Sequence, residues 1–224
     1  MSADEEESKS TPEAYSVGIE LADELRAISQ ALVDRDIASH DLRAALSAAR
    51  EVRPHLDGSP RSRWYETDEP SSFGSETARA FDALSPVRGR LNPVAAPLTM
   101  QVAQREDGSQ YIAGHARLSN VYEGPPHGVH GGIVAALFDE ILSASMALAP
   151  PPGVTAKLEV DYRHLTPVGE DLRLEAWITE ERDRRLHAKA TCHAGDTLTA
   201  QATALFIRID FKEAEDRMKA RADG

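Results

Sequence analysis

The sequence contains a single cysteine, Cys192, among its 224 residues. One cysteine cannot form an internal disulfide, and it cannot supply a cysteine-based metal cluster. Free thiols persist in the reducing cytoplasm, so we expect a cytoplasmic protein. Basic residues are also few, since 25 Lys and Arg stand against 37 Asp and Glu, for a formal net charge of -12. Nucleic acid requires a basic face for its phosphates, so the charge argues against such a partner.

The N-terminus lacks the basic and apolar segments of a secretory signal. Residues 131–149 form the only run apolar enough to cross a membrane. They carry the adjacent acids Asp139 and Glu140 at their centre and have no basic flank. Because a carboxylate in the middle of a bilayer is costly, we expect a buried helix of a soluble protein and no membrane span.

The N-terminal part of the chain divides into segments of different composition. Residues 1–14 are acidic and polar, and we expect them to be disordered. Residues 15–56 predict a helical hairpin, because apolar residues recur at spacings of three and four on both sides of a break. Ser39 is a suitable N-cap for the second helix. Residues 57–96 are rich in Ser, Pro and Gly, and they form either a linker that packs over the main domain or a lid over a binding site.

From residue 97 the apolar residues alternate with the period of a strand. Two strands are expected over residues 98–118, and four more between residues 156 and 209. A helix between the two sets starts at Gly131. Strict alternation indicates a sheet with one buried face, and hence antiparallel pairing. We therefore predict an α+β fold over residues 97–210, with one buried helix against an antiparallel sheet. A charged tail follows over residues 211–224.

A His-Gly-Gly motif at residues 130–132, with Asp139 nine residues after the histidine, lies at the start of this helix. Together with the order of elements, it resembles the hotdog-fold acyl-CoA thioesterases of the phenylacetate-pathway type. Residues 123–132, followed by Asp139 and Thr155, are particularly similar to the thioesterase superfamily members 4 and 5, which act on fatty acyl-CoA. The resemblance covers roughly residues 86–210. It implies a curved antiparallel sheet around a central helix, an acyl-CoA substrate, a role in lipid metabolism and no cofactor.

The start of the predicted helix offers donors for an oxyanion. The first N–H groups of a helix lack partners and carry partial positive charge, and glycine lets a substrate carbonyl approach the backbone. We expect the N–H of Gly132, with that of Gly131 beside it, to bind the thioester oxygen. Asp139 is the expected general base or nucleophile. Glu140 is the rival carboxylate, and Asp139 could instead be a buried acid satisfied by hydrogen bonds.

The spacing of these residues implies a second subunit. Gly132 and Asp139 are seven residues apart, so they lie about 10 Å apart along a helix that rises roughly 1.5 Å per residue. Both cannot touch one reacting carbonyl, because catalytic contacts are about 3 Å long. A two-fold dimer with antiparallel central helices would bring Gly132 of one subunit to Asp139 of the other. We expect a homodimer or a dimer of dimers with the active site at the subunit interface.

The resemblance assigns roles to three further residues. Thr155 would position the water or steady Asp139, although a β-branched residue also suits a strand by propensity alone. His130 would fix the loop at the helix start. Arg163 lies near a strand end and could meet the phosphates of CoA, but exposed arginines are common there. Many relatives carry an asparagine shortly before the motif, where this chain has Glu-Gly-Pro-Pro at residues 123–126.

These expectations combine into an acyl-CoA thioesterase that hydrolyses a fatty acyl-CoA to free acid and CoA. Two alternatives remain, a non-catalytic acyl-CoA-binding module on the same fold and another hotdog enzyme such as a hydratase. His127 and His130 also invite a metal site with Asp139 as third ligand. A glycine between the two histidines is poor support for such a site, so we expect no metal.

Overall fold

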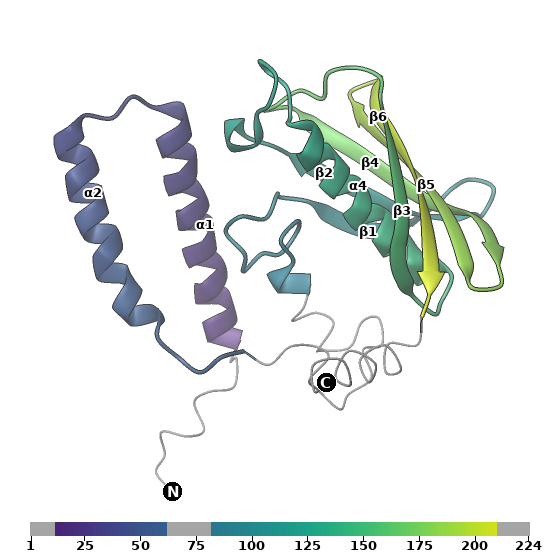
Figure 1. The fold of residues 1–224 in the computed structure, drawn as a ribbon, viewed down its shortest axis with the longest axis horizontal. Coiled ribbons are helices and arrows are strands. Elements are labelled where there is room, and N and C mark those ends of the chain that lie inside the picture. Colours follow the sequence, from purple (N-terminus) through teal and green to yellow (C-terminus); the bar gives the residue numbers. More distant parts are fainter. Residues whose placement is uncertain (1–11, 62–81, 210–224) are drawn as a thin grey trace, which may run out of the picture. The chain divides into compact units, whose positions relative to one another are not determined.

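The computed structural model describes residues 12–61 and 82–209 (Figure 1). Contacts within the chain separate two compact units, Met1–Ala95 and Ala96–Gly224, and each is described by itself. Most of the segment expected to be disordered, half of the expected linker or lid, and the charged tail lie outside the described residues.

The first unit begins with two helices, as predicted. Helix α1 spans Pro12–Asp34, three residues earlier than expected at its start, and α2 spans Ser39–Val52. A 3-10 helix, η2, follows over Arg53–Leu56. The expectation that Ser39 caps α2 is wrong by one residue, because Ala38 holds the cap position with an extended backbone. Alanine has no side-chain acceptor, so this helix start lacks a side-chain cap hydrogen bond.

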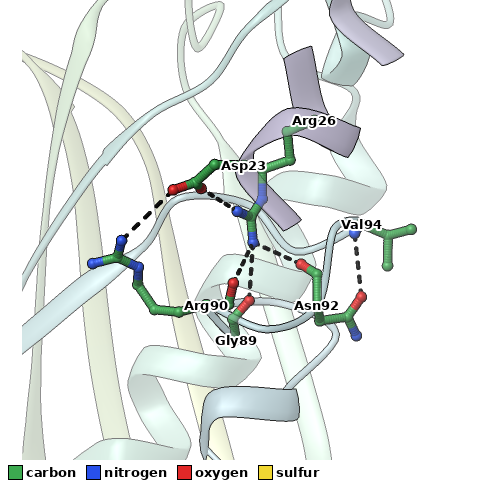
Figure 2. Close-up of polar contacts among 6 residues, drawn as sticks. All are labelled: Asp23, Arg26, Gly89, Arg90, Asn92 and Val94. Atoms are coloured by element: carbon green, nitrogen blue, oxygen red, sulfur yellow. Dashed lines mark hydrogen bonds and ion pairs between the residues drawn. The ribbon is translucent and has the colours of Figure 1, made fainter. Parts of the chain in front are cut away.

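Arg26 of α1 ties the end of the first unit to that helix (Figure 2). Its Nη2 donates to the carbonyl oxygens of Gly89, Arg90 and Asn92 at 3.1, 3.2 and 2.8 Å, and its Nη1 pairs with Asp23 at 2.6 Å. A planar guanidinium can serve several acceptors at once. Residues 89–92, which belong to the segment expected to be a linker or a lid, are therefore anchored on α1 within the first unit.

The second unit is built on one antiparallel sheet of six strands. The strands are β1 (Thr99–Gln104), β2 (Gln110–Arg117), β3 (Gly153–Tyr162), β4 (Asp171–Arg182), β5 (Arg185–Ala194) and β6 (Thr197–Arg208). Their order in the sheet is β1-β2-β4-β5-β6-β3. Strand β3 thus pairs with β6 and forms one edge of the sheet, while β1 forms the other.

Helix α4, Gly131–Ser145, lies along one face of this sheet (Figure 1) and continues into the 3-10 helix η5, Met146–Leu148. Phe138, Ile141 and Leu142 are fully buried. Gly114 of β2 lets the helix approach, because a Cβ there would lie 2.8 Å from Ile141 Cδ1. The sheet face beneath α4 is made of alternate small and branched residues, as the alternation predicts; those of the central strands are Leu172, Leu174, Ala176, Leu186, Ala188, Ala190 and Cys192.

The stretch Gly131–Leu148 is long and apolar enough to cross a membrane by length and composition. The core helix of a soluble protein passes the same test. In the structure this helix packs against the sheet through its buried apolar side chains.

Arg208 holds the chain that leaves the far end of the helix. Its guanidinium donates to the carbonyl oxygens of Ala149 at 2.9 Å and Pro151 at 3.1 Å, and it pairs with Glu181 at 2.7 Å. The side chain is only 13% exposed. Arg208 therefore connects the end of β6, the end of β4 and the segment that follows η5.

Candidate active site

A tight loop over residues 123–129 presents the start of α4. Glu123 and Val129 form an isolated bridge, and the Gly124 N–H donates to the Gly128 carbonyl at 2.9 Å. His127 lies at the tip with φ of 63°, and its backbone N–H donates to Glu123 Oε1 at 2.6 Å. A left-handed backbone is unfavourable for histidine, so the Glu123 carboxylate helps to hold a strained tip.

The first turn of α4 uses one of its two glycine N–H groups internally. His130 is the N-cap, and its Nδ1 accepts the N–H of Gly132 at 3.1 Å. Because Nδ1 is the acceptor, a neutral His130 carries its proton on Nε2. The His130 carbonyl accepts the N–H groups of Ile133 and Val134. Within residues 12–61 and 82–209, no acceptor is found for the N–H of Gly131.

This distribution bears on the prediction that these glycines donate to an oxyanion. The sequence favoured the N–H of Gly132 and placed Gly131 second. In the structure the Gly132 N–H already serves His130, which leaves the Gly131 N–H as the group open to a ligand. Gly131 is the first residue of α4, where the helix leaves its N–H without an internal partner.

Thr155 and Asp139 lie in direct contact. The Thr155 hydroxyl donates to Asp139 Oδ1 at 3.0 Å. A β-bulge on β3 makes this contact possible. Thr155 lies opposite Phe206 and Lys157 lies opposite Leu205, so Ala156 is an extra residue between them.

The bulge reverses the face on which Thr155 lies. In a regular strand, residues two apart share a face, so Thr155 would lie with Lys157 on the outer face. Phe206, its actual partner, is fully buried beneath the helix. Thr155 is therefore on the inner face, where its hydroxyl reaches α4.

Strand β3 contacts α4 a second time at its other end. The Tyr162 hydroxyl donates to the Gly131 carbonyl at 2.8 Å. Sequence reasoning missed Tyr162 as a site residue. The alternation of β3 placed it on the inner face, but nothing in the sequence indicates which part of α4 it meets.

The remaining predicted residues lie close to these contacts. Glu140 follows Asp139 on α4 and is half-buried. Arg163 follows Tyr162 and is exposed, and its guanidinium pairs with Asp161 at 3.2 Å. Within the described residues, no group of three or more His, Cys, Asp and Glu side chains is arranged to hold a metal ion.

The two clusters of site residues lie on one helix and are separated along it. His130, Gly131 and Gly132 occupy the start of α4, and Asp139 lies eight residues after Gly131, which corresponds to about 12 Å along the axis. The helix face that bears Asp139 is partly exposed and otherwise carries small side chains, at Gly132, Ala135, Ala136 and Ser143. One subunit therefore does not bring Asp139 to the open Gly131 N–H.

Part of this chain is similar in sequence to known thioesterases. Residues 127–201 match the Thioesterase superfamily. The human acyl-coenzyme A thioesterase THEM5 is 29% identical over 93 residues, which is 41% of this chain and 38% of THEM5. The rat acyl-coenzyme A thioesterase THEM4 is 33% identical over 90 residues, or 39% of each chain. This chain thus spans less than half the length of these curated relatives.

A crystal structure of a thioesterase superfamily protein supports the fold. It superposes with a TM-score of 0.69 at 24% identity, covering 85% of this chain and 94% of that chain. The sheet order and the helix on its inner face, together with this likeness, confirm the predicted hotdog fold with additional N-terminal helices.

Proposed function

We propose that this chain, which contains a domain of the thioesterase superfamily over residues 127–201, hydrolyses the thioester of an acyl-CoA to free acid and CoA. The observation that carries the proposal is the hydrogen bond from Thr155 to Asp139. Asp139 lies on α4, the helix that begins at Gly131 with an open backbone N–H. The names of the relatives support an acyl-CoA substrate, over the part of their length that this chain matches.

The Gly131 N–H is the proposed donor to the thioester oxygen. It stands at the positive end of the helix dipole, and negative charge develops on that oxygen as the carbonyl carbon is attacked. The Gly132 N–H can contribute only when His130 turns away from it. In our proposal, His130 therefore acts as the cap that sets the first turn of α4.

Asp139 is the proposed general base or nucleophile. Thr155 donates to Oδ1, which orients the carboxylate and leaves Oδ2 to face the substrate. As a base, Asp139 takes a proton from water while the water oxygen bonds to the thioester carbon. The carbon–sulfur bond then breaks, and the departing thiolate of CoA takes up a proton. As a nucleophile, Asp139 would attack the thioester carbon, break the carbon–sulfur bond and release the CoA thiolate, which takes up a proton. Water would then hydrolyse the resulting acyl anhydride to free acid and restore the carboxylate.

The working site is proposed to form between two subunits. Antiparallel packing of α4 against the α4 of a second subunit, related by a two-fold axis, would bring Gly131 of one subunit beside Asp139 of the other. The small side chains on the exposed face of α4 support this arrangement, because they allow two helices to approach closely. A homodimer or a dimer of dimers would then contain two equivalent sites for each pair of subunits.

The finer substrate assignment rests on the resemblance. We propose a fatty acyl chain, a role in lipid metabolism and a cytoplasmic location. The Arg163 backbone N–H donates to the Thr199 carbonyl at 2.8 Å, while its side chain is exposed and pairs with Asp161. In our proposal, the guanidinium exchanges Asp161 for a phosphate of CoA. Glu140 is the second carboxylate on α4 near the reacting groups.

The test is the release of free CoA thiol from a panel of acyl-CoAs that differ in chain length. We expect release that depends on Asp139. Acyl-CoA binding without thiol release would instead favour the non-catalytic binding module. Water addition to an enoyl-CoA without thiol release would favour a hydratase.

A further inference from the structure

We infer that Tyr162 is a positioning residue that fixes the peptide unit between Gly131 and Gly132. The inference rests on the proposed function, because it concerns the first turn of α4 on which the proposed oxyanion donor lies. Tyr162 lies opposite Ala200 at the last position of β3, on the inner face of the sheet. Its hydroxyl donates to the Gly131 carbonyl at 2.8 Å.

The same peptide unit is held at its other end. Its N–H belongs to Gly132 and donates to His130 Nδ1 at 3.1 Å. The hydrogen bonds therefore form a continuous chain from the Tyr162 hydroxyl through one peptide to the His130 imidazole. Each bond polarises the next, so the phenol strengthens the cap that His130 makes.

Two successive glycines need such a restraint. Glycine loses more backbone freedom on folding than any other residue, and Gly131 and Gly132 have no side chains with which to fix their own conformation. The Tyr162 ring also covers Gly131, since a Cβ at Gly131 would lie 3.4 Å from Tyr162 Oη and 3.5 Å from Cζ. Tyr162 thus limits both the rotation of the peptide and the displacement of Gly131.

The consequence is that β3 sets the geometry of both halves of the proposed site. Thr155 near its start orients the Asp139 carboxylate, and Tyr162 at its end orients the glycine turn. The Gly131 N–H belongs to the preceding peptide, so Tyr162 acts on it through the position of Gly131. A displaced Gly131 would still permit substrate binding by other groups, but its misdirected N–H would stabilise the transition state less well. Loss of the Tyr162 hydroxyl should therefore lower kcat and leave KM nearly unchanged.

The sequence allows the peptide to be observed directly. Gly131 and Gly132 are the only adjacent pair among the 14 glycines. Protein labelled with [1-13C,15N]glycine therefore gives a single HNCO cross-peak, from the Gly131 carbonyl carbon and the Gly132 amide. Tyr162→Phe keeps the ring and removes the hydroxyl. Tyr111→Phe is the matched control, because Tyr111 belongs to no proposed site. Tyr111 lies on β2, and the centre of its ring is 4.4 Å from the guanidinium carbon of Arg105.

We expect Tyr162→Phe to shift this carbonyl resonance and to lower kcat roughly threefold to tenfold, the worth of one hydrogen bond. Tyr111→Phe should do neither. An unchanged cross-peak in Tyr162→Phe would overturn the inferred contact, whether or not the protein is active. A shifted cross-peak with unchanged kcat would overturn the positioning role. Wild-type protein that releases no thiol would contradict the proposed function, and the cross-peak would still decide the contact.

Discussion

The hydroxyl of Thr155 lies 3.0 Å from the Asp139 carboxylate because one extra residue, Ala156, turns Thr155 to the inner face of the sheet. This relationship ties an irregularity in an edge strand to the carboxylate on the central helix. It also makes the roles of Thr155 and Asp139 separable by mutation, since a hydroxyl can be removed without moving the acid.

Replacement of Asp139 by asparagine should abolish most hydrolysis while the fold is kept. Asparagine is nearly isosteric and can still accept the Thr155 hydrogen bond, but it cannot take up a proton from water. We expect kcat to fall about a hundredfold or more, the usual worth of a general base. Thiol release under saturating acyl-CoA measures the effect. A fully active Asp139→Asn variant would remove Asp139 from the mechanism.

At Thr155 the prediction concerns the hydroxyl alone. Thr155→Val retains the β-branched shape and removes the donor to Asp139, so kcat should fall roughly tenfold, as expected when one hydrogen bond to a charged group is lost. Thr155→Ser is the control and should keep most of the activity. Equal losses in the two variants would show that shape matters at this position, rather than the hydroxyl.

The cap formed by His130 should contribute measurably to stability. Removal of an N-cap side chain costs about 1 kcal/mol, so His130→Ala should lower the free energy of unfolding by that order. His130→Asn restores a side-chain acceptor at the cap and should recover most of the loss. Urea denaturation of the two variants compares them directly. If His130→Ala is as stable as the wild type, the hydrogen bond between His130 Nδ1 and the Gly132 N–H does not contribute to the free energy of unfolding.

Cys192 should be unreactive in the folded protein. Burial raises the pKa of its thiol, with a smaller opposing effect from the Thr199 hydroxyl. A raised pKa leaves less thiolate at neutral pH, and the thiolate is the reactive form. The native protein should react with Ellman's reagent far more slowly than the urea-unfolded protein. Rapid labelling of the native state would contradict this burial and would also complicate thiol-release assays.

Arg208, the last residue of β6, should contribute substantially to the free energy of unfolding. Arg208→Met keeps the length of the side chain and removes its bonds to the Ala149 and Pro151 carbonyls and to Glu181. Because these partners would lose a nearly buried cation, we expect a loss of about 2 kcal/mol in the free energy of unfolding. Arg117→Met is the control, since Arg117 is 66% exposed and makes one long ion pair, and it should be close to neutral. Similar losses in both variants would contradict the assignment.

Much of the fold follows from sequence periodicity. The alternation of Leu172, Leu174 and Ala176 with charged residues predicts a sheet with one buried face, and the apolar helix after Gly131 predicts what covers it. The position of β3 at the sheet edge could not be predicted, because alternation does not specify which strands pair. Ala38 rather than Ser39 caps α2, since propensity fixes helix ends only to within a residue or two.

The sequence proposes residues for the candidate site, Tyr162 excepted, but it does not predict the contacts among them. The spacing between the His-Gly-Gly motif at residues 130–132 and Asp139 indicated these residues as candidates. Strict alternation would have placed Thr155 on the outer face, and only the bulge at Ala156 places it beside α4. The use of the Gly132 N–H by His130 depends on a side-chain rotamer, and the contact of Tyr162 with Gly131 depends on how β3 crosses the helix. Neither leaves a local signal in the sequence.

Gly131→Pro offers a selective way to remove the proposed oxyanion donor. Proline lacks an N–H and is favoured at the first position of a helix. His130 already has φ of -57° and ψ of 131°, a conformation that suits a residue before proline. The variant should therefore fold, bind acyl-CoA and lose about a hundredfold in kcat, as for loss of one oxyanion donor. Full activity would exclude the Gly131 N–H from catalysis.

Mixing this variant with Asp139→Asn tests whether the site is shared between subunits. Each variant alone should keep only about a hundredth of the wild-type activity as a homodimer. A mixed dimer has one site that carries both substitutions and one site with Gly131 from one chain and Asp139 from the other, both intact. After unfolding and refolding together in equal amounts, random pairing should restore roughly a quarter of the wild-type activity. If each site were contained within one chain, the mixture would stay as inactive as the separate variants, and that result would contradict the shared site.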